Sequence, residues 1–206
     1  GAGSGDEPDT QGIRRYGDNA PRMQFKPAVF WFAQKNYDPS LLYMEQAQIL
    51  SGEDITVGSY YCLAAMMKWY SKISPEDGRK VPQDLIYENS DPKIPLFIYR
   101  SSWETPDAAY LGIRAGSTRQ VNHSHVDVGS FVYYKDQVRW VSELGVADYT
   151  LAEKYLGHDP FFKIRQDAPR WLVQREGPFG HSIATFDGQI PAIDSKSIFG
   201  TVSPVI

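Results

Sequence analysis

The first apolar stretches of the chain have helical spacing. Residues 27–36 form an apolar and aromatic run that begins at a proline, which is tolerated in the first turn of a helix. Asp38 and Pro39 are a helix N-cap and first-turn pair, and this second helix is predicted to end near Leu50. A third helix is predicted over 59–73, where apolar residues recur three or four positions apart. Short helices joined by tight turns are typical of antiparallel helix pairs.

Beyond Pro95 the pattern changes to alternation of apolar and polar residues, which is typical of strands. The predicted strands are 96–100, 109–114, 130–135, 138–144, 171–175 and 181–186. The pairs Asp136-Gln137 and Asp187-Gly188 predict tight hairpin turns. Residues 151–167 have neither period and are interpreted as irregular. Successive antiparallel strands of this kind predict a β-sandwich.

The two patterns together predict an α+β chain in three parts. Residues 1–26 are small, acidic and turn-prone, and we interpret them as a loop or linker. Residues 27–90 are predicted to be a helical hairpin region, and residues 91–206 an antiparallel β-sandwich domain. The prolines and acidic residues before Pro95 mark the boundary between the two.

The composition of the chain argues against some classes of binding partner. The chain has 206 residues, of which 42% are hydrophobic and 22% charged, so it can bury a core and is not of the disordered class. A net charge of −4, with no basic aromatic patch, argues against nucleic-acid binding. No apolar run approaches the roughly 20 residues needed to span a bilayer, so no membrane partner is expected. The single cysteine, Cys62, excludes an intrachain disulfide.

Candidate chemistry is concentrated in residues 121–131. His123 and His125 are two positions apart, so on an extended segment they share one face with Asp127. His181 follows a later strand-like segment. Imidazoles and a carboxylate from neighbouring strands suit zinc, and the pattern therefore predicts a plausible zinc site. Asp127 is expected to hold a histidine ring or a turn rather than to bind the metal.

Several blocks around these histidines resemble the heparinase II/III-like polysaccharide lyases. The blocks are Tyr99–Trp103, Ala109–Gly116, Asn122–Phe131, Val138–Gly145, Asp148-Tyr149, Arg170-Trp171 and Gly180–Ile183. They occur in the family's order over about residues 96–190. The resemblance implies that the chain holds the last helices of an (α/α) toroid and the first part of an antiparallel β-sandwich. Because proteins of this family are several times longer, it also implies that the rest of the same enzyme, or a second copy, is a partner.

The activity that the resemblance implies is β-elimination of an anionic uronate polysaccharide, of the heparin or heparan, chondroitin or alginate kind. A base removes the proton α to the uronate carboxylate, positive groups neutralise that carboxylate, and an acid protonates the leaving glycosidic oxygen. His123 matches the family's catalytic histidine, and an imidazole with a pKa near neutrality suits this role. The family also implies a bacterial periplasmic or secreted location.

The same resemblance implies a ligand set for a mainly structural Zn2+. The matching positions are His125, Glu143 and His181, and Glu143 stands where the family has an aspartate. The candidate substrate contacts are Asn122, Arg139 and Tyr149. Two of these residues have an alternative interpretation that stays open: Asn122 as a cap of the turn, and Arg139 as a structural residue of the sheet.

The family's catalytic tyrosine and second histidine come from the toroid, and no motif assigns the tyrosine role to Tyr16, Tyr37 or Tyr43. We therefore expect little lyase activity from the isolated chain. Two alternatives remain open. A non-catalytic carbohydrate-binding sandwich would explain the 5 tryptophans and 13 tyrosines, and a structural zinc-binding module would explain the histidines alone.

Overall fold

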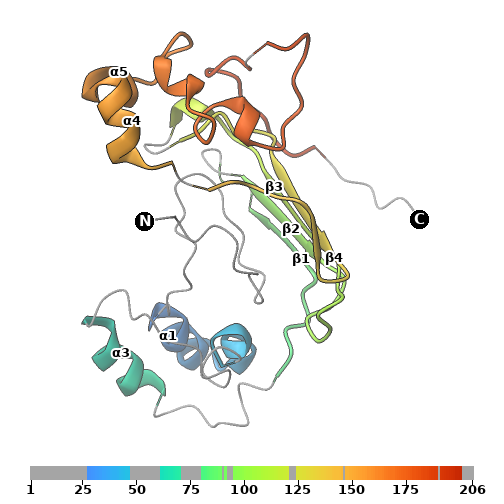
Figure 1. Ribbon diagram of the computed structural model, residues 1–206. Helices are drawn as coiled ribbons and strands as arrows, with labels where there is room; N and C mark the ends of the chain where they lie inside the picture. The colour runs from blue at the N-terminus through green and yellow to red at the C-terminus, as the bar shows by residue number, and fades with distance from the viewer. Residues whose placement is uncertain are drawn as a thin grey trace. The chain divides into compact units, whose positions relative to one another are not determined.

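The computed structural model describes residues 27–46, 61–70, 80–89, 91, 95–120, 124–145, 147–189 and 191–200. The chain divides into two compact units, and among the described residues the first ends at Asp84 and the second begins at Leu85. Figure 1 draws the helices of the first unit in blue to teal and the strands of the second in green to yellow. Each unit has its own core and is described by itself.

The helical unit contains α1 (Pro27–Asn36), the 3-10 helix η1 (Pro39–Leu42), which continues as an α-helix over 43–46, and α3 (Tyr61–Tyr70). Its core is formed by Phe30, Ala33 and Leu42, and Trp69 of α3 packs against them. The predicted helices are therefore confirmed where the structure describes them. Residues 47–60 and 71–79, which include the predicted ends of the second and third helices, lie outside the described residues.

The N-cap predicted at Asp38 is confirmed. Its carboxylate accepts a hydrogen bond from the backbone N–H of Ser40 at 3.1 Å, and Pro39 occupies the first turn. A proline there costs nothing, because the first N–H groups of a helix have no partner inside it.

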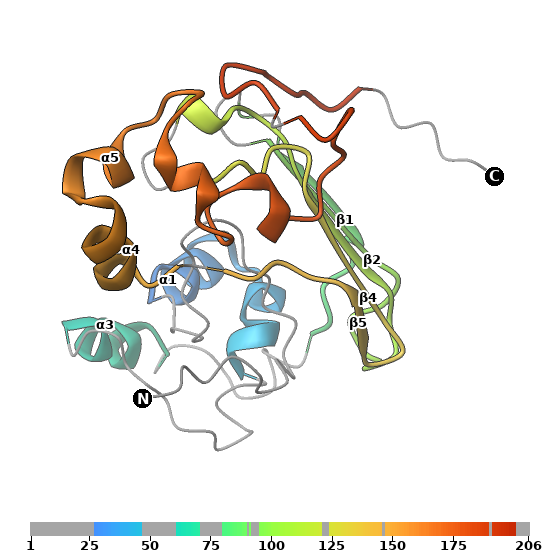
Figure 2. The same cartoon turned by 45° about the horizontal axis from the view of Figure 1, so that its top comes forward.

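The second unit is built on one antiparallel sheet whose strands follow chain order. The strands are β1 (Ile86–Asn89), β2 (Leu96–Arg100), β3 (Tyr110–Arg114), β4 (Phe131–Lys135) and β5 (Val138–Val141). Figures 1 and 2 show them side by side. The predicted strands 96–100, 109–114, 130–135 and 138–144 are confirmed, although the last ends at Val141. The pattern predicts no strand at β1, which owes its extended form to pairing with β2, with Ile86 opposite Tyr99.

Both predicted hairpin turns are confirmed. Asp136 and Gln137 have φ angles of 53° and 60°, the left-handed pair of a type I′ turn between β4 and β5. Asp187 and Gly188 have φ angles of 51° and 67°, and a β-bridge joins the residues on either side of them.

Two predicted strands and one predicted irregular segment are wrong. Residues 171–175 are not a strand, because Pro169 starts the 3-10 helix η4 (Pro169–Leu172) and a turn follows it. Residues 181–186 follow the 3-10 helix η5 (Pro178–Gly180) and have no regular structure apart from an isolated bridge at Phe186. Residues 151–167 are not irregular: α4 (Tyr149–Leu156) and α5 (His158–Phe162) occupy much of them. The Asp148 carboxylate caps α4 by accepting from the N–H of Leu151 at 3.0 Å. Figure 2 shows this region as short orange helices and turns.

The sheet has one face with buried side chains, which we call the buried face. On β3 it carries Tyr110, Gly112 and Arg114, and on β4 it carries Val132. The α+β class is thus confirmed, and the described residues form a single sheet. No helix among them is long and apolar enough to cross a membrane.

Candidate functional site

The segment from Ser124 to Ser130 connects the 3-10 helix η3 (Thr118–Gln120) to β4 and carries His125 and Asp127. Four buried residues lie in a row from 124 to 127. Val126 packs in the second unit's core with Ala168, Trp171 and Ile193. This apolar anchor turns the polar residues on either side of it toward the protein interior.

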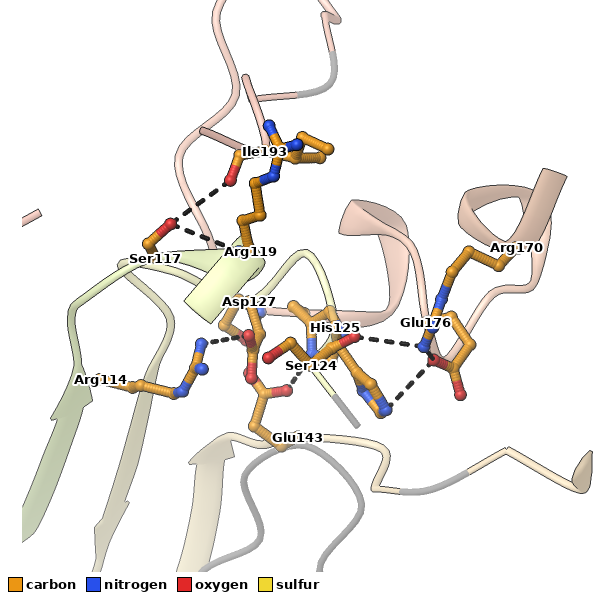
Figure 3. Close-up of polar contacts among 12 residues, drawn as sticks. Arg114, Ser117, Arg119, Ser124, His125, Asp127, Glu143, Arg170, Glu176 and Ile193 are labelled. Carbon is orange, nitrogen blue, oxygen red and sulfur yellow. Dashed lines mark hydrogen bonds and ion pairs between the residues drawn. The ribbon is translucent and has the colours of Figure 1, made fainter. Parts of the chain in front are cut away.

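Asp127 lies in an ion pair with Arg114, the last residue of β3 (Figure 3). The Asp127 side chain is 1% exposed, and burial raises the pKa of this carboxyl above its usual range, against the opposing charges of Arg114 and His181. Its Oδ2 atom has no hydrogen-bond partner among the described residues. The Asp127 side chain thus joins the segment before β4 to the end of β3.

His125 faces a buried acid–base pair on the other side. Its Nε2 lies 3.4 Å from Oε2 of Glu176, and the same oxygen accepts a hydrogen bond from Nη2 of Arg170 at 2.6 Å. Arg170 also donates to the carbonyl oxygen of Ser124 at 3.2 Å. Figure 3 shows these contacts as one continuous chain of dashed lines. All three charged or titratable side chains are between 0% and 3% exposed.

His181 and Glu143 form a second imidazole–carboxylate pair. His181 Nδ1 contacts Oε2 of Glu143, whose other oxygen accepts from the backbone N–H of Ser182 at 3.2 Å. The centroids of the His125 and His181 rings are 5.2 Å apart. The structure therefore brings together His125, Glu143 and His181, which come from three distant segments of the chain.

One ring nitrogen of each histidine in this cluster faces a carboxylate: His125 Nε2 faces Glu176, and His181 Nδ1 faces Glu143. Among the residues that the structure describes, no group of three His, Cys, Asp or Glu side chains is arranged to hold a metal ion. His181 Nε2 is nevertheless buried and has no hydrogen-bond partner in the described part of the chain. The cluster has the residue types and the burial of a zinc site, without its coordination geometry.

The remaining candidates are placed differently. Asn122 and His123 lie outside the described residues. Arg139 is exposed on β5, opposite Tyr134 of β4. Tyr149 begins α4 and packs edge-on against Phe161 at 5.1 Å between ring centroids, so it belongs to an aromatic cluster and not to the histidine cluster.

Three residues of the site are missed by sequence reasoning: Arg114, Arg170 and Glu176. Arg114 could have been found from the sequence, because it falls at an inward-facing position of a predicted alternating strand. A buried guanidinium at such a position needs an acidic partner. Arg170 and Glu176 lie in 3-10 and turn structure with no periodicity, and only their burial reveals them.

Comparison with known proteins does not extend this picture: no protein-family model matches the sequence, and no curated protein matches it. The resemblance to the heparinase II/III-like lyases therefore depends on the sequence blocks over residues 96–190. The geometry of the cluster is an independent observation.

Proposed function

We propose that this chain is part of a heparinase II/III-like polysaccharide lyase that cleaves uronate-containing glycans by β-elimination. The observation that most supports the proposal is the convergence of His125, Glu143 and His181, because the resemblance implies these three residues as one ligand set. On this proposal the helical unit is the end of an (α/α) toroid. The five-stranded sheet is then the first part of a β-sandwich.

Zinc is the metal that this donor set suits best. Two imidazoles and one carboxylate are common zinc ligands, and the unpartnered Nε2 of buried His181 is a donor that a cation would satisfy. When bound, zinc would supply a structural link between the segment that carries His125 and the segments that carry Glu143 and His181. The side chains of the three are 0–2% exposed, so they cannot touch a polysaccharide, and the metal's role is structural.

The chemistry then belongs to residues outside the cluster. His123, two positions before His125, takes the proton α to the uronate carboxylate. The electron pair forms a double bond to the neighbouring carbon, the glycosidic C–O bond breaks, and an acid from the part of the toroid outside this chain protonates the leaving oxygen. Arg139 stabilises the carboxylate as negative charge develops on it, and Asn122 and Tyr149 contact the sugar.

A lyase assay tests this proposal. The longest form of the protein that contains this chain is incubated with heparan sulfate, chondroitin sulfate or alginate, and ultraviolet absorbance reports the new conjugated double bond. The expected result is turnover of one such polymer, with a loss of at least about 100-fold in His123→Ala, the lower range for general acid–base catalysis. The 206-residue chain alone is expected to show little turnover.

His158→Ala is the matched control, since the His158 side chain is 71% exposed and pairs with Glu153 on the surface. Equal activity in His123→Ala and the parent would contradict the assigned base. Strong activity of the chain alone would show that toroid residues outside this chain are not needed.

The deep burial of the cluster also favours a second candidate, a structural zinc-binding module without chemistry. This candidate predicts that zinc stabilises the fold and that no uronan is cleaved by any form of the protein. The lyase assay and a zinc-dependent melting curve together separate the two.

A further inference from the structure

A row of arginines and tyrosines crosses the buried face of the sheet. Arg100 of β2 pairs with Tyr110 of β3, Tyr110 with Tyr134 of β4, and Tyr134 with Arg139 of β5. Residues directly opposite one another in neighbouring strands point to the same side of a sheet, so these four side chains form one line. We call it the Arg–Tyr row.

The row and the histidine cluster share this face. Tyr110 belongs to the row, and Arg114, which pairs with Asp127 in the cluster, is four residues further along β3. At about 3.3 Å per residue this separation is about 13 Å along the strand. The row therefore lies about four residues from the strand end that supports the buried cluster, and it is the more exposed of the two.

Arg100 lies over two aromatic rings at one end of the row. Its guanidinium carbon lies 4.5 Å from the ring centroid of Trp103 and 4.7 Å from that of Tyr110. Stacking leaves the in-plane N–H groups of a guanidinium available, and these match the two oxygens of a carboxylate. The side chain is half-buried, and burial lowers the pKa of Arg100, while the neighbouring Tyr110 acts in the opposite direction.

No acid in the described part of the chain pairs with Arg100, and none pairs with Arg139 at the other end. By contrast, Arg114, Arg119, Arg165 and Arg170 each pair with an acid. A register shift between Tyr133 and Tyr134 places a β-bulge beside Arg139, a feature that re-aims side chains near binding sites. The neighbouring Trp140 is 65% exposed.

We propose that the Arg–Tyr row is a binding subsite for an acidic saccharide. Arg100 and Arg139 take its carboxylate groups, the half-buried rings of Tyr134 and Trp103 contact the sugar, and Tyr110 supports Arg100 from below. The choice of a uronate as ligand rests on the proposed function. The row itself indicates two properties of the ligand: its arginines favour an anion, and its aromatic rings favour a group that can stack on them.

Calorimetric titration of the full chain with an unsulfated hexauronate tests the proposal, with a neutral hexasaccharide of glucose as the comparison ligand. Arg139→Gln and Arg100→Lys are each expected to weaken hexauronate binding about tenfold, because each removes a charge-assisted bidentate contact. Arg165→Gln is the matched control, an exposed arginine that pairs with Asp167 away from the row, and its affinity is expected to stay unchanged. The neutral sugar is expected to bind at least tenfold more weakly than the hexauronate.

Parent-like affinity in both row variants, or equal binding of the neutral sugar, would overturn the subsite. Arg139 is exposed on β5, so its variant keeps the test decisive even if Arg100→Lys does not fold. The titration is repeated with His123→Ala, which removes cleavage but not the row. If the longest form of the protein binds the hexauronate but cleaves no uronan, the lyase proposal is wrong and the subsite proposal stands. If that form cleaves a uronan but the row variants bind with parent affinity, the lyase proposal stands and the subsite proposal is wrong.

Discussion

Arg170 is the residue on which the histidine segment depends most directly. It joins Glu176 at 2.6 Å and the Ser124 carbonyl at 3.2 Å, and its guanidinium lies 4.8 Å from the ring centroid of Trp171. The Glu176 backbone carbonyl also accepts from the N–H of Val126 at 2.9 Å. Side chain and backbone together hold the residues on both sides of His125, which fixes the direction of the imidazole.

Replacing Arg170 by Met is expected to lower the free energy of unfolding by about 3–5 kcal/mol, because Glu176 is left as a buried charge without its cation. Denaturant titration followed by tryptophan fluorescence measures the change. Arg165→Met is the matched control: that side chain is 60% exposed, and surface pairs of this kind contribute at most about 1 kcal/mol. Equal losses in the two variants would show that the buried pair does not hold the segment.

At the scale of elements, η5 shows how close packing places a functional side chain. The turn ends at Gly180, directly before His181. A methyl group on Gly180 would lie 2.1 Å from the carbonyl oxygen of Gln174, far inside the normal contact distance. The residue must be glycine because the backbone of the preceding turn lies against it, not because of its φ angle.

Gly180→Ala is therefore expected to lower the free energy of unfolding by about 1–3 kcal/mol, the range for overpacked sites. Gly200→Ala is the control, since nothing lies within 4 Å of a methyl group there, and its change is expected to be within about 0.5 kcal/mol. Both are measured by denaturant unfolding. A neutral Gly180→Ala would mean that the turn can relax and that His181 is not rigidly placed.

For the whole molecule, the cluster links segments that no local pattern connects. His125 precedes β4, Glu143 follows β5, and His181 follows η5. A ligand that binds this arrangement but not the unfolded chain must stabilise the fold of the second unit.

Zinc is expected to raise the melting temperature, with a stabilisation of about 2.7 kcal/mol when free zinc is 100-fold above its Kd. Differential scanning calorimetry with zinc and with a chelator measures it. The response is expected to vanish in His181→Ala and to persist in His158→Ala, whose side chain is 71% exposed. An unchanged response in His181→Ala, or no response in the parent protein, would contradict zinc binding at this cluster.

Patterns over a few residues were sufficient to predict the elements that depend only on interactions between near neighbours in the sequence. The cap at Asp38, the type I′ turn at Asp136-Gln137 and the strands β2 to β5 follow from hydrogen bonding, φ preference and alternation over a few residues. The same reasoning failed for residues 171–175 and 181–186. Their alternating composition is real, but Pro169 starts a 3-10 helix that runs into the first segment, and the second segment has only an isolated bridge at Phe186.

What the sequence alone determined is the α+β class, most element positions and the identity of the candidate ligands. Only the tertiary structure decided that His125, Glu143 and His181 share one cluster and that Arg114, Arg170 and Glu176 support it. The physical reason is that a buried charge is tolerated only beside its partner. That partner can come from any part of the chain that folding brings near, so spacing along the sequence does not reveal it.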